Sequence, residues 1–162
     1  MRIAGLVQDS IVDGRGMRFV VFTQGCPHHC EGCHNPETHD PSGGKELTVD
    51  AVIKEMLSNP MTDGVTLSGG EPFMQPQDCA EIAKAAHNAG LNVWAYTGYT
   101  FEKLLESENE AVRELLNEVD VLIDGPFVLK ERSLSIPWRG SKNQRMIDVA
   151  QSLIEGRVVQ LD

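Results

Sequence analysis

Short β-prone runs alternate along this chain with helical segments, and that alternation limits its possible folds more than any other feature. Strands are predicted at residues 17–22, 65–68, 92–96 and 121–124. Helices are predicted where apolar side chains recur every three or four positions, at residues 49–57, 77–89, 101–105 and 112–119. Strands separated by helices usually join a parallel sheet through crossover connections. We therefore expect an α/β fold with a mostly parallel sheet.

The chain length limits how far this sheet can close. A complete eight-stranded βα barrel needs about 250 residues, and this chain has 162. We therefore expect a partial, open βα barrel formed by a single domain over residues 1–162. The tail of the chain fits either two short strands, at 146–149 and 158–161, or a helix over 149–155.

Three segments with unusual composition each follow the end of a predicted strand. A long loop rich in glycine, proline and histidine extends from Gly25 to Gly44. The second strand is followed by Gly69-Gly70-Glu71, and the third by Thr97-Gly98-Tyr99. Ligands of parallel α/β sheets bind beyond the carboxyl ends of the strands, so we expect these three segments to meet on one rim.

Charge and hydropathy exclude several kinds of partner. The 14 Lys and Arg against 24 Asp and Glu give a formal net charge of −10, which would repel a phosphate backbone, so we expect no nucleic acid partner. The apolar stretches span only a handful of positions and are too short to cross a membrane. The first ten residues lack the apolar centre of a secretory signal. We expect a cytoplasmic protein that binds no membrane.

Basic residues gather in one segment and reverse the charge there. They are Lys130, Arg132, Arg139, Lys142 and Arg145. Such a segment is either a solvated loop or a surface for an anionic ligand or a partner. Arg139 and Arg145 fit both the binding of a ligand carboxylate and the docking of a partner.

Three of the four cysteines, Cys26, Cys30 and Cys33, fall within eight residues. Disulfides at that density are typical of small exported domains, and this chain is long enough to fold without them, so metal binding is the better explanation. Thiolates favour zinc or iron–sulfur clusters. A structural zinc ion would need a fourth ligand, which His28, His29 or His34 could supply. A 4Fe–4S cluster would instead keep one iron open to an outside ligand, and both alternatives remain open on the cysteines alone.

The fourth cysteine and the glycine pair each have a plain interpretation. Cys79 shares an apolar helical face with Ile82 and Ala83, so we expect it in the core. Gly69-Gly70 at a strand end is often only a turn. Two glycines nevertheless let a ligand approach the backbone closely, and Glu71 adds a carboxylate. Beside an open iron, this strip suits a ligand with an ammonium or sulfonium group.

Together, the cysteine spacing and Gly69-Gly70-Glu71 resemble the motifs of the radical S-adenosylmethionine enzymes. The resemblance implies one 4Fe–4S cluster held by the metal-binding and catalytic residues Cys26, Cys30 and Cys33. It also implies contacts to S-adenosylmethionine from Gly32, Cys33, His34, Gly69, Gly70, Glu71 and Thr97. Gly32 stands where many of these enzymes have an aromatic residue, so adenine is expected to rest on the backbone of residues 32–34.

Further segments are similar to those of the glycyl-radical activating enzymes that serve anaerobic ribonucleoside-triphosphate reductases. They are Asp13-Gly14-Arg15-Gly16, with Arg15 in place of a frequent proline, and the segments 94–99, 124–127 and 138–145. The similarity covers about residues 10–149. It implies an oxidoreductase that takes an electron from a donor such as flavodoxin or ferredoxin. That electron splits S-adenosylmethionine, and the resulting 5′-deoxyadenosyl radical makes a glycyl radical on the large reductase subunit.

Several other functions compete with this interpretation. The activase of another glycyl-radical enzyme, or a compact small-molecule synthase of the carboxy-deazaguanine type, would share the motifs. The segments 124–127 and 138–141 argue against the synthase. A zinc-binding interaction module would contain no iron or sulfide, and an iron–sulfur electron carrier would ignore S-adenosylmethionine.

Overall fold

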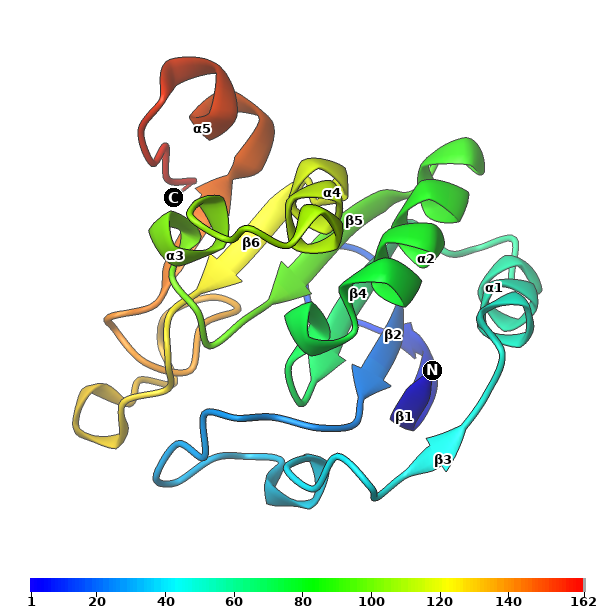
Figure 1. Cartoon of the computed structure of the whole chain (residues 1–162), viewed down its shortest axis with the longest axis horizontal. Helices are drawn as coiled ribbons and strands as arrows, with labels where there is room; N and C mark the ends of the chain where they lie inside the picture. The colour runs from blue at the N-terminus through cyan, green and yellow to red at the C-terminus, as the bar shows by residue number, and fades with distance from the viewer. Residues whose placement is uncertain (162) are drawn as a thin grey trace.

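The computed structural model describes residues 1–161, so Asp162, the last residue of the predicted domain, lies outside them. Seven strands form one sheet in the order β3-β1-β2-β4-β5-β6-β7 (Figure 1). They are β1 (Arg2–Ser10), β2 (Arg18–Thr23), β3 (Lys45–Glu46), β4 (Gly64–Gly69), β5 (Asn92–Tyr96), β6 (Val121–Asp124) and β7 (Arg145–Asp148). Strands β2, β4, β5 and β6 are parallel, and β1, β3 and β7 run antiparallel to their neighbours. The sheet ends at β3 and β7 without closing, which confirms the open α/β barrel.

Five α-helices connect or flank the strands. They are α1 (Val49–Leu57), α2 (Pro76–Asn88), α3 (Phe101–Leu105), α4 (Glu110–Glu118) and α5 (Val149–Glu155), with short 3-10 turns η1 (Pro36–Thr38), η2 (Pro72–Met74) and η3 (Leu129–Glu131). Two of the helices begin at a threonine cap: the Thr48 hydroxyl accepts a hydrogen bond from the Ala51 N–H, and the Thr100 hydroxyl accepts one from the Lys103 N–H. A polar cap satisfies an N–H group that the first turn cannot pair itself. Within residues 1–161, no helix has both the length and the apolar character needed to cross a membrane.

The two faces of the sheet are buried in different ways. Along β5, Val93 and Ala95 point to one face and Trp94 to the other, as the alternation of a strand requires. The first face carries the main core, under α1, α2 and α4 (Figure 1). Cys79 is fully buried there, which confirms its predicted place. The second face holds only a small cluster around Trp94, Ile123 and Met146, and a cavity adjoins it.

Two parts of the fold differ from the sequence-based expectation. β1 had no predicted counterpart, and its register against β2 shifts twice, between Ile3 and Gly5 and between Val7 and Ser10. The tail forms β7 and then α5, so the expected strand near 146–149 and the expected helix over 149–155 are both present, one after the other. The predicted strand at 158–161 is wrong, because only a single bridge between Ile147 and Gln160 forms there.

Candidate functional site

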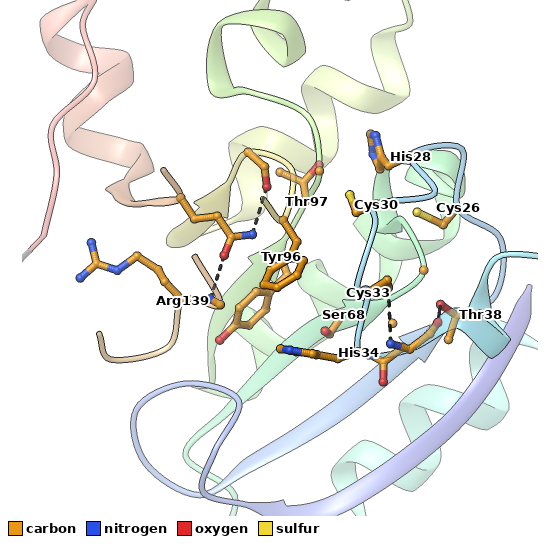
Figure 2. Close-up of a pocket in the computed structure, with 18 of the residues that line it drawn as sticks. Cys26, His28, Cys30, Cys33, His34, Thr38, Ser68, Tyr96, Thr97 and Arg139 are labelled. Atoms are coloured by element: carbon orange, nitrogen blue, oxygen red, sulfur yellow. Dashed lines mark hydrogen bonds between the residues drawn. The ribbon is translucent and has the colours of Figure 1, made fainter. Parts of the chain in front are cut away.

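The carboxyl ends of β2, β4 and β5 open onto one cavity of about 700 Å³ (Figure 2). Its wall includes residues from all three segments that were expected to meet: Cys26, Cys30, Cys33, Gly69, Gly70, Thr97 and Gly98. The predicted common rim is therefore present. A cavity of this volume is in the usual range for a cofactor or small-molecule site.

The cysteines lie on the loop that leaves β2 at Thr23. This loop bends back at Gly25, which has φ of +103°, and the Gly25 N–H donates to the Thr38 carbonyl at 2.7 Å. A tight turn then forms where the Cys33 N–H donates to the Cys30 carbonyl at 3.1 Å. The thiols of Cys26, Cys30 and Cys33 are free and half-buried, and all three line the cavity. All three sequence-predicted ligands therefore line the same cavity.

Backbone N–H groups point at two of the three cysteine sulfurs, those of Cys26 and Cys33. Burial raises the pKa of the Cys26 thiol, while hydrogen bonds from the backbone of His28 and His29 act in the opposite direction. The Asn35 N–H points at the Cys33 sulfur at 3.4 Å. Hydrogen bonds of this kind stabilise and tune metal-bound thiolates in iron–sulfur proteins.

This donor set fits a cluster better than a single ion. The described residues contain no group of three His, Cys, Asp or Glu side chains placed to share one metal ion. The histidines that could have completed a zinc site point elsewhere: His28 contacts Glu71, His29 packs on His39 and His34 packs on Phe127. Three thiolates without a fourth protein ligand suit a 4Fe–4S cluster with one open iron.

Glu71 is fully buried, and hydrogen-bond donors of the protein itself bind its carboxylate. The Thr97 hydroxyl lies 2.9 Å from both carboxylate oxygens, and the N–H groups of Gly98 and Phe73 donate at 2.8 and 3.1 Å. The His28 Nε2 lies 2.6 Å from Oε1. Glu71 is absent from the cavity wall within residues 1–161. The sequence predicted that this carboxylate would face a cationic ligand, and the structure places it behind the cavity wall instead.

Gly69 and Gly70 bring the strip at the end of β4 against the cysteine loop. The N–H of Gly70 donates to the Thr23 carbonyl, and that of Glu71 donates to the Gly25 carbonyl, both at 2.8 Å. A β-carbon on Gly69 would come within 2.5 Å of the Thr23 nitrogen, and one on Gly70 would overlap the Gly25 oxygen. The glycines therefore permit close contact between the two segments as well as access to their backbone.

The residues expected to contact adenine are divided between two environments. Cys33 and His34 line the cavity. Gly32 has φ of +76°, and a β-carbon there would meet the Leu129 side chain at 2.8 Å. Gly32 is thus required where the loop turns beneath η3.

The cavity wall also contains residues to which the sequence alone assigned no role. They include Asp13, Tyr96, Trp138 and Gln144, besides Arg139. The Tyr96 hydroxyl donates to the Trp138 carbonyl at 2.8 Å, so the chain that follows β6 is joined to β5. The only sequence signal for these residues was that they lie in the segments 13–16, 94–99 and 138–145, which are similar to those of the glycyl-radical activating enzymes.

Arg145 does not reach the cavity wall. Its guanidinium contacts both oxygens of Asp124, at 3.0 and 2.6 Å, and the exposed carboxylate of Glu102 at 2.5 and 3.2 Å. These hydrogen bonds, first with Asp124 and then with Glu102, raise the pKa of Arg145. Of the two arginines whose roles the sequence left open, Arg145 joins β7 to β6, and Arg139 is one of the residues that line the cavity.

A family model and several curated relatives match most of this chain. The family model for a 4Fe-4S single cluster domain matches residues 12–147. The anaerobic ribonucleoside-triphosphate reductase-activating protein of Escherichia coli K12 is 34% identical over 145 residues, 83% of this chain and 90% of the relative. Its counterpart in phage T4 is 39% identical over 144 residues, 83% and 86%. The pyruvate formate-lyase-activating enzyme of Clostridium pasteurianum is 40% identical over 114 residues, 65% and 48%.

Proposed function

Because this chain belongs to the anaerobic ribonucleoside-triphosphate reductase-activating proteins and contains their 4Fe-4S single cluster domain, we propose that it cleaves S-adenosylmethionine reductively and makes a glycyl radical on such a reductase. The observation that supports this most is the shared cavity. Three free thiols, two strand-end glycines and Thr97 line one space at the open end of the sheet. Residues 1–162 would act as one activase domain.

Cys26, Cys30 and Cys33 would hold the cluster and leave one iron without a protein ligand. When bound, the cluster supplies the electron that breaks the S–C5′ bond of S-adenosylmethionine. The chain itself supplies the half-buried thiolates and the N–H groups of His28, His29 and Asn35 that stabilise them.

The backbone of Gly69 and Gly70 would bind the methionine end of S-adenosylmethionine, beside Thr97. Adenine would lie along Cys33 and His34, with Gly32 shaping the turn behind them. Glu71 would act indirectly, because its carboxylate is fully occupied by donors from the protein. These residues would orient the molecule and exclude water, which is the main contribution of a protein to cofactor chemistry.

The overall reaction needs no general acid or base. One electron, one S-adenosylmethionine and one glycine α-hydrogen give methionine, 5′-deoxyadenosine and the glycyl radical. Glycine suits this role because no side chain hinders the approach and the radical is delocalised onto the flanking amides. The sheet ends at β3 and β7 without closing, and this gap would admit a loop of the large reductase subunit.

The electron would come from a small redox protein such as flavodoxin or ferredoxin, and the reaction would take place in the cytoplasm. A second candidate target is another glycyl-radical enzyme, since the pyruvate formate-lyase-activating enzyme of C. pasteurianum is 40% identical over 114 residues. The two targets differ only in the partner polypeptide.

Electron paramagnetic resonance tests the proposal. The iron-loaded, reduced protein is mixed with S-adenosylmethionine and either an anaerobic ribonucleotide reductase or pyruvate formate-lyase. We expect a glycine-centred signal on the reductase, with narrower splitting when its glycines are deuterated at the α-carbon. A signal only on the lyase would change the assigned target, and no signal on either would refute the activase function.

A further inference from the structure

His28 lies where the three segments of the site meet. It stands between Cys26 and Cys30 in the sequence, and its Nε2 lies 2.6 Å from Oε1 of Glu71. Its ring packs edge-on against Tyr99, with 4.5 Å between centroids. A β-carbon on Gly98 would overlap the same imidazole. One side chain of the cysteine loop thus contacts both the Glu71 strip and the turn after β5.

The hydrogen bond between His28 and Glu71 has a defined direction. Glu71 is fully buried, and its carboxylate accepts hydrogen bonds from Thr97, Gly98 and Phe73. An ionised carboxylate can only accept, so the His28 Nε2 carries the hydrogen and donates it. Charge-assisted hydrogen bonds to a buried carboxylate are about twice as strong as neutral ones.

This contact is also the main polar attachment of the middle of the loop. Bonds from Gly25 and Cys26 to the Thr38 and His39 carbonyls hold the loop ends. Residues 27–34 form one internal turn, from Cys33 to Cys30. Among the described residues, the His28–Glu71 bond is the one hydrogen bond that joins 27–34 to a segment beyond the loop, besides the local bonds to the adjoining Cys26 and Asn35.

We propose that His28 is a positioning residue for the reaction proposed above, on which this inference rests. By donating to Glu71, it fixes the cysteines relative to Gly69 and Gly70. The cluster and the methionine end of S-adenosylmethionine would therefore be held at a constant separation. His28 itself would not contact the reacting atoms, since its Nε2 is directed at a buried carboxylate.

Three variants separate the hydrogen bond from the bulk of the ring. His28→Leu keeps an apolar side chain of similar size and removes the donor. His28→Gln restores an N–H at about the same reach. Glu31→Gln is the matched control, because Glu31 is exposed on the same loop and its substitution leaves the His28–Glu71 bond intact. Iron and sulfide content is measured for each protein.

The first readout is the binding of S-adenosylmethionine to the iron-loaded proteins, together with the change it causes in the spectrum of the reduced cluster. Because small misplacements at such sites cost roughly tenfold to hundredfold, we expect His28→Leu to lose at least about tenfold in affinity and most of the spectral change. His28→Gln and Glu31→Gln should stay close to wild type. Wild-type affinity in His28→Leu, or equal loss in His28→Gln, would overturn the proposal.

The second readout needs no cofactor. In the iron-free proteins, the rate at which iodoacetamide alkylates Cys26, Cys30 and Cys33 reports how often the loop opens. We expect a several-fold faster rate in His28→Leu than in wild type, His28→Gln or Glu31→Gln, and equal rates would overturn the inference. If wild-type protein with a full cluster does not bind S-adenosylmethionine, the proposed function is wrong. The alkylation rates would still test whether the His28–Glu71 bond attaches the loop.

Discussion

The carbonyl oxygen of Gly25 lies directly against the α-carbon of Gly70, so closely that no β-carbon fits between them. Gly25 begins the cysteine loop, and Gly70 lies in the strip that follows β4. The same oxygen accepts the Glu71 N–H at 2.8 Å. The two segments of the candidate site are therefore joined backbone to backbone, and side-chain volume at Gly70 decides their distance.

Gly70→Ala should accordingly displace the cysteine loop. We expect the variant to retain much less iron after anaerobic reconstitution and to bind S-adenosylmethionine at least about tenfold more weakly. Gly5→Ala is the control, since a β-carbon at Gly5 has nothing within 4 Å. Iron analysis and equilibrium binding check both variants, and a Gly70→Ala protein with wild-type affinity would show that the contact is not needed.

The cysteines provide a second prediction. Cys33→Ala should abolish cleavage of S-adenosylmethionine, because it removes one of three thiolates that line the cavity. Cys79→Ala should keep most of the activity and lose only about 1 kcal/mol of stability, because Cys79 is a core residue under the sheet. Product analysis by chromatography distinguishes the two, and equal loss in both variants would overturn the ligand assignment.

The ion pair between Arg145 and Asp124 should contribute to the stability of the fold and not to the binding of S-adenosylmethionine. Asp124 is 1% exposed, so Arg145→Gln would leave a buried carboxylate without its main partner and cost about 2 kcal/mol. Glu102→Gln should cost less than about 1 kcal/mol, because that carboxylate is 56% exposed. Urea unfolding at pH 7 measures both. Similar losses in the two variants would contradict the assignment.

His87 should make stability depend on pH. It lies 2.9 Å from both Glu118 and Asp120. Burial opposes the charged ring, but hydrogen bonds with Asp120 and Glu118 outweigh it and raise the pKa of His87 above 6.5. A raised folded-state pKa adds stability that is complete below pH 6.5 and is lost as pH rises through the folded-state value.

We therefore expect His87→Gln to lower the free energy of unfolding more at about pH 6 than at about pH 9. Urea titrations of wild type and variant at both pH values give the comparison. His29→Asn is the control, since it removes an exposed imidazole that packs on His39. A loss that is equal at both pH values, or larger at the higher one, would contradict the prediction.

Much of the fold could be predicted from the sequence because local patterns decide it. The parallel strands contain runs of buried residues, such as residues 93–95 of β5, and the helices begin at caps such as Thr48. β1 could not be predicted, because its side chains alternate irregularly between buried and exposed and Gly5 interrupts it. Its pairing with β2 and β3, which is not local, holds it in the sheet.

The site was predictable where residue type alone carries the chemistry. Three closely spaced cysteines and a strand-end glycine pair could be recognised from spacing. The burial of Glu71 could not, because its donors Thr97 and His28 come from separate segments that only the folded sheet brings together. The position of Arg145 depends in the same way on the antiparallel pairing of β7 with β6.

The most direct test of the central claim is the formation of 5′-deoxyadenosine. Anaerobically reconstituted protein is reduced with dithionite in the presence of S-adenosylmethionine, and the products are quantified beside those of Cys33→Ala. The account predicts equal amounts of 5′-deoxyadenosine and methionine from the wild type and none from the variant. A wild-type protein that holds its full complement of iron and sulfide yet forms no 5′-deoxyadenosine would contradict it.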